Sequence, residues 1–407
     1  MKNLIYILLT ITIGLGSTCV FSQEAARLDL KELRKKADSV LNQSNVSARS
    51  EIDVVFRLVD RLLEEDSADA EHYLIKGLEH FPWNLKYQMV YAELLAKRGK
   101  TAQARDKADL VLQYAETDDL IERARKVAGE EALPKFDKIK SLPGSHHCVV
   151  LVPMMEADKW LIVRVKEQLS EVLGIPVYIQ TIETDYPPFG RDLRGAILNQ
   201  VRRKIKEDIN DPQVTNVLKD LDITKEDLAE EAKLLRVLKT LMGDAGPERI
   251  VEFESYLEQS RGKDPQWDAN QLQEVLFRAV KPYRRKNVAY LGMTFADIYA
   301  KDFNFLFGWA DRQGGVMSYR RFTADFNDEI PNQDRLIKRT LMQCLSSTGH
   351  IYGIKRCTNP TCARAYPNSL PEHDAKKGTL CAQCRSGFKR VFAQTHAGDS
   401  LKAATEK

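Results

Sequence analysis

Near its C-terminal end the chain reads Ser346-Ser-Thr-Gly-His350-Ile-Tyr-Gly353-Ile-Lys-Arg356-Cys357-Thr-Asn-Pro-Thr-Cys362, and after residues 363–380 it continues Cys381-Ala-Gln-Cys384. Two closely spaced cysteine pairs around a loop of this size are typical of a tetrahedral thiolate cage for Zn²⁺. Such a cage is full and leaves no coordination position for water, so it supports structure and not catalysis. We therefore expect one structural zinc ion, held by Cys357, Cys362, Cys381 and Cys384.

The N-terminus has the pattern of a secretory signal. A lysine precedes an apolar run from Leu4 to Leu15, and small residues and Val20-Phe-Ser22 follow it. We predict that residues 1–22 are a signal peptide and that the mature protein is periplasmic or secreted. Gly16-Ser-Thr18 is a poor lipidation box, which argues against a lipid anchor at Cys19. No later segment approaches the ~20 apolar residues of a transmembrane helix, so we expect no stable membrane span in the mature chain.

Export leaves a second interpretation of the cysteines open. An oxidising compartment permits disulfides, so the two cysteine pairs could close bridges in place of holding a metal. The spacing favours zinc.

Length and charge narrow the class of protein. A chain of 407 residues is long enough for two or three domains, each with its own core. The net charge is only +3, and the lysines and arginines are interspersed with acids. This distribution gives no reason to expect a nucleic-acid partner.

Residues 24–135 are predicted to form an all-helical domain. From about residue 49 the apolar spacing is helical, with no strand-like alternation. Small and apolar residues recur at the offsets of a tetratricopeptide repeat, first at Ala70, Leu74, Gly77 and Pro82, and 34 residues later at Ala104, Ala108 and Val111. The segment resembles two degenerate tetratricopeptide repeats. It would supply either a peptide-binding groove or a structural spacer.

The pattern changes after a linker at residues 136–147. Residues 148–152 read as a short buried strand, residues 160–172 as an amphipathic helix and residues 176–181 as a second strand. A strand, a helix and a strand in so short a segment predict a crossover unit with parallel strands. We therefore expect an α/β domain with a mixed, mainly parallel sheet.

This second domain is predicted to cover residues 148–395. Its sheet is interrupted by a charged helical insertion at about residues 208–275 and resumes at Val288. Residues 396–407 are expected to be a flexible tail.

The segment before the cysteines lacks a catalytic metal motif. A zinc protease of this kind uses two histidines one helical turn apart, with a glutamate between them that activates water. None of the seven histidines of this chain is followed by glutamate, and His350 stands alone. One imidazole cannot hold zinc. We therefore assign no catalytic residues.

Residues from about 148 to 390 resemble an archaemetzincin, a metzincin-type zinc metalloprotease. The signature of that family is H-E-x-x-H-x-x-G-x-x-H-C-x4-C-x-M, followed by C-x-x-C. The four cysteines match its structural zinc site with one residue fewer in the loop, His350 matches its second histidine and Gly353 matches its glycine. Residues 291–308 resemble the strand and loop that lead into the protease core. Residues 314–320 resemble the edge strand that pairs with an extended substrate.

The departures from that signature bear on function. Ser346 stands in place of the first histidine, Ser347 in place of the general-base glutamate and Arg356 in place of the third histidine. Arg364 stands in place of the methionine. The loss of a general base alone lowers the catalytic rate by roughly 10²–10⁴-fold. The resemblance thus implies the fold and the structural zinc, while the departures argue against peptidase activity.

Three hypotheses follow. The first is an exported pseudo-metalloprotease that binds a peptide or protein partner without cleaving it. The second is an archaemetzincin-like aminopeptidase with rearranged ligands, in which His350 combines with His373 or an acidic residue. The third is a zinc-stapled adaptor with no ligand in its cleft. Whether residues 208–275 block the cleft is left open.

Overall fold

The computed structural model describes residues 29–42, 49–67, 69–139, 146–187, 190–243, 247–262 and 265–405. The predicted signal peptide, residues 1–22, lies outside these ranges. The chain divides into two compact units, Met1–Ala132 and Leu133–Lys407. Among the helices of the described ranges, none combines the length and the apolar character that a membrane crossing requires.

The first unit is helical throughout its described residues. Its helices are α2 (Leu30–Leu41), α3 (Arg49–Glu64), α4 (Asp69–His80), α5 (Leu85–Lys97), α6 (Thr101–Tyr114) and α7 (Asp118–Ala128). Neighbouring helices in the chain pack on each other. A Cβ atom on Gly77 would lie 2.8 Å from the ring of Phe56, so the close approach of α3 and α4 requires glycine there. The prediction of an all-helical first domain is confirmed.

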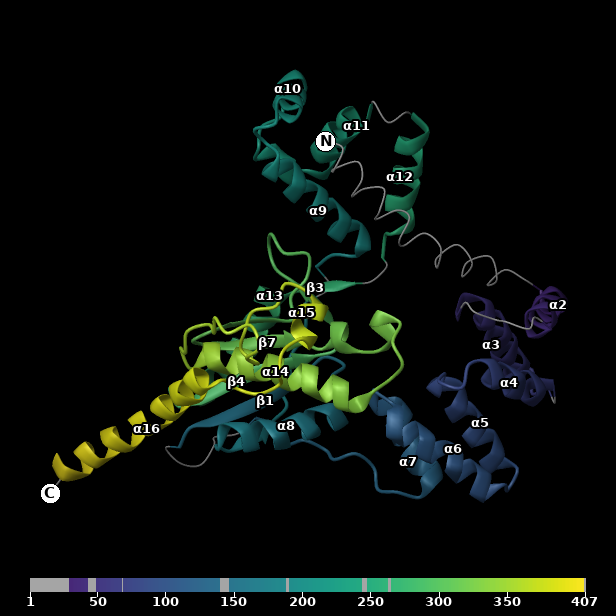
Figure 1. The fold of residues 1–407 in the computed structure, drawn as a ribbon, viewed down its shortest axis with the longest axis horizontal. Coiled ribbons are helices and arrows are strands. Elements are labelled where there is room, and N and C mark those ends of the chain that lie inside the picture. Colours follow the sequence, from purple (N-terminus) through teal and green to yellow (C-terminus); the bar gives the residue numbers. More distant parts are fainter. Residues whose placement is uncertain are drawn as a thin grey trace. The chain divides into compact units, whose positions relative to one another are not determined.

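The second unit is built on a five-stranded sheet with the order β2-β1-β4-β7-β6. Figure 1 labels three of its strands, β1, β4 and β7. The strands are β1 (Cys148–Met154), β2 (Val177–Ile179), β4 (Val288–Thr294), β6 (Gly308–Asp311) and β7 (Gly314–Ser318). All neighbours pair in parallel except β6, which is antiparallel to β7. Helix α8 (Lys159–Leu173) makes the expected crossover from β1 to β2. The predicted fold class, α/β with a mixed and mainly parallel sheet, is confirmed.

Helices cover both faces of this sheet. Helix α14 (Gln333–Ile351) packs with α8 and contacts β4, β6 and β7. Helix α13 (Ala269–Val280) lies on the other face and packs into a hydrophobic core with side chains of β1, β4 and β7. Every residue of β4 is buried, as expected for a central strand of a sheet covered on both faces. The sheet therefore fixes the position of α14, which carries residues 346–350.

The prediction that residues 314–320 form the edge strand is wrong. Strand β7 lies inside the sheet, between β4 and β6. The chain turns back at Arg312 and Gln313, so residues 308–311 pair with β7 and cover the edge that it would otherwise expose. Strand β6 is the edge strand on this side of the sheet, and β2 forms the opposite edge. This exchange matters for function because the edge strand is the one that can accept an added peptide strand.

The inserted helices end earlier than expected. Helix α9 (Leu193–Glu207) precedes the insertion, whose helices are α10 (Pro212–Asp220), η1 (Asp227–Ala229), α11 (Glu231–Met242) and α12 (Pro247–Gln259). Residues 266–275, predicted to belong to the insertion, instead form β3 (Gln266–Asp268), which pairs with β5 (Asp297–Tyr299), and the first half of α13. The reason is burial, because Ala269, Leu272 and Val275 pack into the core of the sheet.

The C-terminal segment combines short elements with one long helix. The short elements are η3 (Lys281–Tyr283), η4 (Arg320–Phe322), η5 (Asp325–Asn327) and α15 (Leu370–Asp374). Helix α16 spans Ala382–Thr405 and so includes most of the tail that was expected to be flexible from residue 396. Alanine, leucine and lysine are frequent at the end of this segment, and all three favour helix.

Candidate functional site

The four predicted zinc ligands come together. Cys357 and Cys362 lie in the irregular segment after α14, and Cys381 and Cys384 lie at the start of α16. Their four Sγ atoms all lie within 4.8 Å of one another, and the Sγ atoms of Cys357 and Cys381 are 3.6 Å apart. Zn–S bonds of ~2.3 Å in a tetrahedron place sulfur atoms about 3.8 Å apart. All four cysteines are free, and the donor set fits zinc.

Hydrogen bonds favour the charged form at Cys381, whereas burial raises the pKa of the Cys357 and Cys384 thiols. The backbone N–H of Cys381 donates to Cys362 Sγ at 3.4 Å, and Arg364 Nη1 donates to Cys384 Sγ at 3.6 Å. Burial acts to raise the pKa of the Cys381 thiol, but hydrogen bonds from the Cys384 backbone and the other thiols lower it to about 7. The thiolate is the form that binds a metal.

Arg364 connects the cysteines to the end of α14. Its side chain is 1% exposed, and it donates to the carbonyl oxygens of Ile354 (2.8 Å) and Lys355 (3.2 Å). Its Nε is buried without a hydrogen-bond partner. A Cβ atom on Gly349 would overlap the guanidinium, so α14 has no side chain at this point. The buried cation therefore lies directly against the helix that carries His350.

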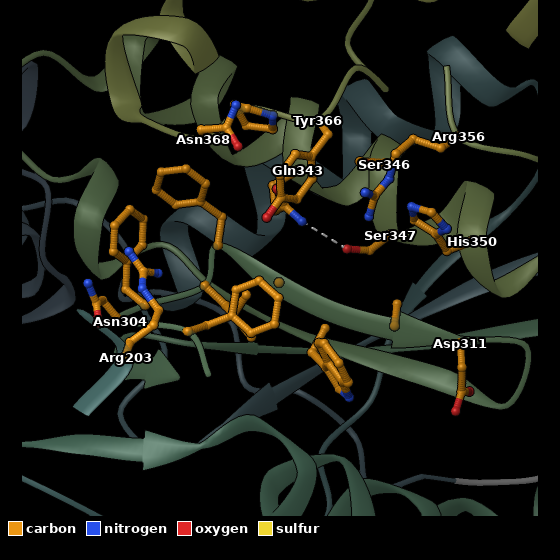
Figure 2. A pocket seen from close by; sticks show the side chains of 18 residues that line it. Arg203, Asn304, Asp311, Gln343, Ser346, Ser347, His350, Arg356, Tyr366 and Asn368 are labelled. Atoms are coloured by element: carbon orange, nitrogen blue, oxygen red, sulfur yellow. Dashed lines mark hydrogen bonds between the residues drawn. The ribbon is translucent and has the colours of Figure 1, made fainter. Parts of the chain in front are cut away.

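A pocket of about 600 Å³ lies beside this helix (Figure 2). One wall is the face of α14 with Gln343, Ser346, Ser347 and His350. The other walls are residues 303–311, which include edge strand β6, and the segment with Arg356 and residues 366–368. Arg203 of α9 also reaches the pocket, whereas residues 208–275 contribute none of the described lining. The inserted helices after α9 therefore do not form its walls.

The degenerate positions named from the sequence meet in this pocket. Ser347 is buried, and Gln343 Nε2 donates to its Oγ at 3.2 Å. Ser346 and His350 are half-buried. The Arg356 guanidinium lies 4.3 Å from the centre of the Tyr366 ring, and Figure 2 shows it extending toward Ser347 beside His350.

The pocket is electropositive. Burial lowers the pKa of His350, and the positive charges of Arg356 and Arg364 lower it further. Among the described lining residues the only carboxylate is Asp311, whose Oδ1 accepts a hydrogen bond from the Gln313 backbone at 2.6 Å. Two arginines beside a single imidazole disfavour a divalent cation here. Within the described ranges, the four cysteines are the only group of three or more metal-ligating side chains close enough to share an ion.

His373, the partner suggested for a rearranged metal site, lies elsewhere. It is fully buried, its Nε2 is 3.0 Å from the Arg339 carbonyl oxygen, and its ring stacks on Phe322. Burial lowers its pKa to about 3. His373 does not line the pocket. The structure does not bring it together with His350.

Sequence reasoning missed several residues of the site. Gln343 lies one helical turn before Ser347, a spacing that could have placed it on the same face of the helix. Tyr366 and Trp309 carried no signal, because the pocket brings them to α14 from separate loops and strands.

Comparisons with known proteins point to one family. The sequence model of Peptidase family M54 matches residues 269–390. The archaemetzincin of Pyrococcus horikoshii is 31% identical over 134 residues, which are 32% of this chain and 71% of that protein. The archaemetzincin of Pyrococcus furiosus is 34% identical over 101 residues, 24% of this chain and 53% of that protein. A crystal structure of archaemetzincin from Methanopyrus kandleri is 18% identical with a TM-score of 0.37, covering 61% of this chain and 96% of that one.

The chain belongs to the archaemetzincin family, a family of zinc metallopeptidases. It spans about half the length of several of the curated relatives that it matches.

Proposed function

We propose that this chain is an exported, catalytically inactive archaemetzincin that keeps one structural zinc ion and binds a peptide or protein partner. The observation that carries the proposal is the content of the pocket beside α14. Two hydroxyls and a guanidinium surround the one histidine there, at the positions where the family signature has two further histidines and a glutamate.

The chemistry of these side chains supports the loss of activity. A catalytic zinc needs about three protein ligands and lowers the pKa of its bound water. His350 offers one ligand, and Arg356 adds a permanent positive charge where a cation would have to bind. Ser347 cannot accept a proton from water as a carboxylate does. Zinc in the cysteine cluster would have no open position and would only stabilise the fold.

Strand β6 supports the binding of an extended partner. It is at an edge of the sheet, so within the described ranges one side of its backbone has no neighbouring strand, and its residues 308–311 line the pocket. An extended peptide can add to such an edge through main-chain hydrogen bonds. The helical unit would supply a further contact surface. The proposed export depends on the signal pattern of residues 1–22.

The test is a cleavage assay on a mixture of unstructured peptides, read by mass spectrometry. We expect no hydrolysis by the wild-type chain at saturating zinc. A variant with Ser346→His, Ser347→Glu and Arg356→His restores the signature and serves as the matched comparison. Zinc-dependent hydrolysis by the wild-type chain that disappears in His350→Ala would overturn the proposal and favour an aminopeptidase with rearranged ligands.

Partner binding has its own measurement. Amide hydrogen exchange of residues 308–311 is followed while an extended, threonine- and valine-rich hexapeptide is added. Slower exchange of these amides supports strand addition at β6. Unchanged exchange at millimolar peptide would contradict this mode of binding, even if the chain is inactive.

A further inference from the structure

The side chains that replace the metal ligands form a set of hydrogen-bond donors. Gln343 Nε2 donates to Ser347 Oγ, so the hydroxyl proton of Ser347 is not used in that bond. Ser346 presents a second hydroxyl from the same face of α14. Figure 2 shows the Arg356 guanidinium extending toward Ser347. Donors from two separate segments therefore converge on one end of the pocket.

The charge at this end is uncompensated. Within the described ranges, Arg356 pairs with no carboxylate, and its contact is with the ring of Tyr366. The buried guanidinium of Arg364 donates to two carbonyl oxygens and to Cys384 Sγ, so the thiolate cluster offsets its charge and Arg356 is the cation that stays available to a ligand. Positive charge without a counter-ion in a half-buried pocket attracts anions.

The planar fork of an arginine matches a carboxylate or a phosphate through two parallel hydrogen bonds. The position beside β6 favours a carboxylate, because an extended peptide along this edge carries carboxylates at its C-terminus and on acidic side chains. Tyr366 holds the fork in place by stacking on it, which reduces the entropy lost on binding.

We infer that this pocket binds a carboxylate of a peptide, held by the Arg356 guanidinium and the hydroxyls of Ser346 and Ser347. The inference rests on the proposed function, since the pocket must be free of a catalytic metal. The carboxylate comes either from the C-terminus or from an acidic side chain, and both sources share the same recognition chemistry.

The experiment uses the full chain labelled with ¹³C-histidine, and it follows the ring signal of His350, assigned by its loss in His350→Gln. Three probes are titrated: N-acetyl-alanyl-alanine, its C-terminal amide, and N-acetyl-aspartyl-alanine amide. We expect at least one of the two acids to bind about 10-fold or more tightly than the uncharged amide, as for the loss of a charge-assisted hydrogen bond. The acid that binds identifies the source of the carboxylate.

Variants test the donors. Arg356 is exposed, so Arg356→Gln leaves the fold intact and should reduce the binding of the acids to that of the amide. Arg356→Lys keeps the positive charge but lacks the planar guanidinium. Its affinity for the acids should lie between those of the wild type and of Arg356→Gln. Arg390→Gln removes the same charge from an exposed side chain that does not line the pocket, and it should bind as the wild type does.

Three results would overturn the inference: no difference between acids and amide, no effect of Arg356→Gln, or tighter binding of inorganic phosphate than of either acid. None of these results contradicts the proposed function, provided that the cleavage assay stays negative and peptide slows the amide exchange of β6. Zinc-dependent cleavage by the wild-type chain would instead remove the proposed function itself.

Discussion

The cysteine cluster and the pocket are neighbours in the chain, since Cys357 follows Arg356, yet only the cluster offers a complete set of metal ligands. The reason lies in the part of the fold to which the cluster and the pocket each belong. The cluster joins a segment with little regular secondary structure to the start of α16. The pocket is formed by α14, which is stabilised by packing on the sheet. We therefore expect the fold to tolerate the absence of metal ligands in the pocket but not in the cluster.

The largest expected effect is that of Cys381→Ser. Structural zinc contributes about 10 kcal/mol or more to the folding of small metal-stapled segments, so this variant should lose its zinc and the cooperative unfolding of the second unit. Thermal unfolding and zinc content are the measurements.

Cys344→Ser is the matched control for this substitution. Cys344, on α14, is fully buried against Met317 of β7. The Cys344→Ser variant should lose about 1–3 kcal/mol in the free energy of unfolding, because it buries a hydroxyl, and it should keep its zinc. Unchanged thermal stability and zinc content in Cys381→Ser would show that the cluster does not hold the segment together.

Gly349→Ala tests the boundary between the two sites. The new methyl group would overlap the Arg364 guanidinium and force it away from its carbonyl partners. We expect a loss of about 3 kcal/mol in the free energy of unfolding, although alanine favours helix over glycine by about 1 kcal/mol. Denaturant unfolding measures it.

In an Arg364→Met background the same substitution should cost less than about 1 kcal/mol, because a flexible thioether can move aside. An equal cost in both backgrounds would mean that Arg364 does not occupy the space beside α14.

His373→Gln sharpens the comparison through pH, because His373 is the histidine that a rearranged metal site would need. Its pKa is about 3 in the folded chain, against an ordinary value near 6.5 in the unfolded chain. The unfolded state therefore binds more protons between these values, and stability falls as pH decreases from about 6.5 toward 3.

From pH 7.5 to 5.5 this histidine should account for about 1.4 kcal/mol of lost stability. The loss should be absent in His373→Gln, with exposed His146→Gln as the matched control variant. The measurement is the free energy of unfolding at saturating zinc. Identical pH dependence of wild type and His373→Gln would contradict the burial of a neutral His373.

Local patterns predicted much of this molecule. The crossover from β1 to β2 and the convergence of four cysteines follow from periodicity and spacing, which act over short stretches of chain. The place of β7 inside the sheet did not follow, because it depends on a hairpin that brings residues 308–311 to the edge. The positive charge that Arg356 brings to the pocket followed from the sequence, whereas that of Arg364 did not, since Arg364 approaches His350 only through the packing of Gly349.

The most direct test of the account is the number of zinc ions per chain, measured by elemental analysis of the purified protein with a parallel count of reactive thiols. We predict one zinc ion in the wild type, with the four cysteines reactive only after chelation, and two in Ser346→His/Arg356→His. Two zinc ions in the wild type, falling to one in His350→Ala, would contradict the account. A zinc-free chain with oxidised cysteines would contradict it equally.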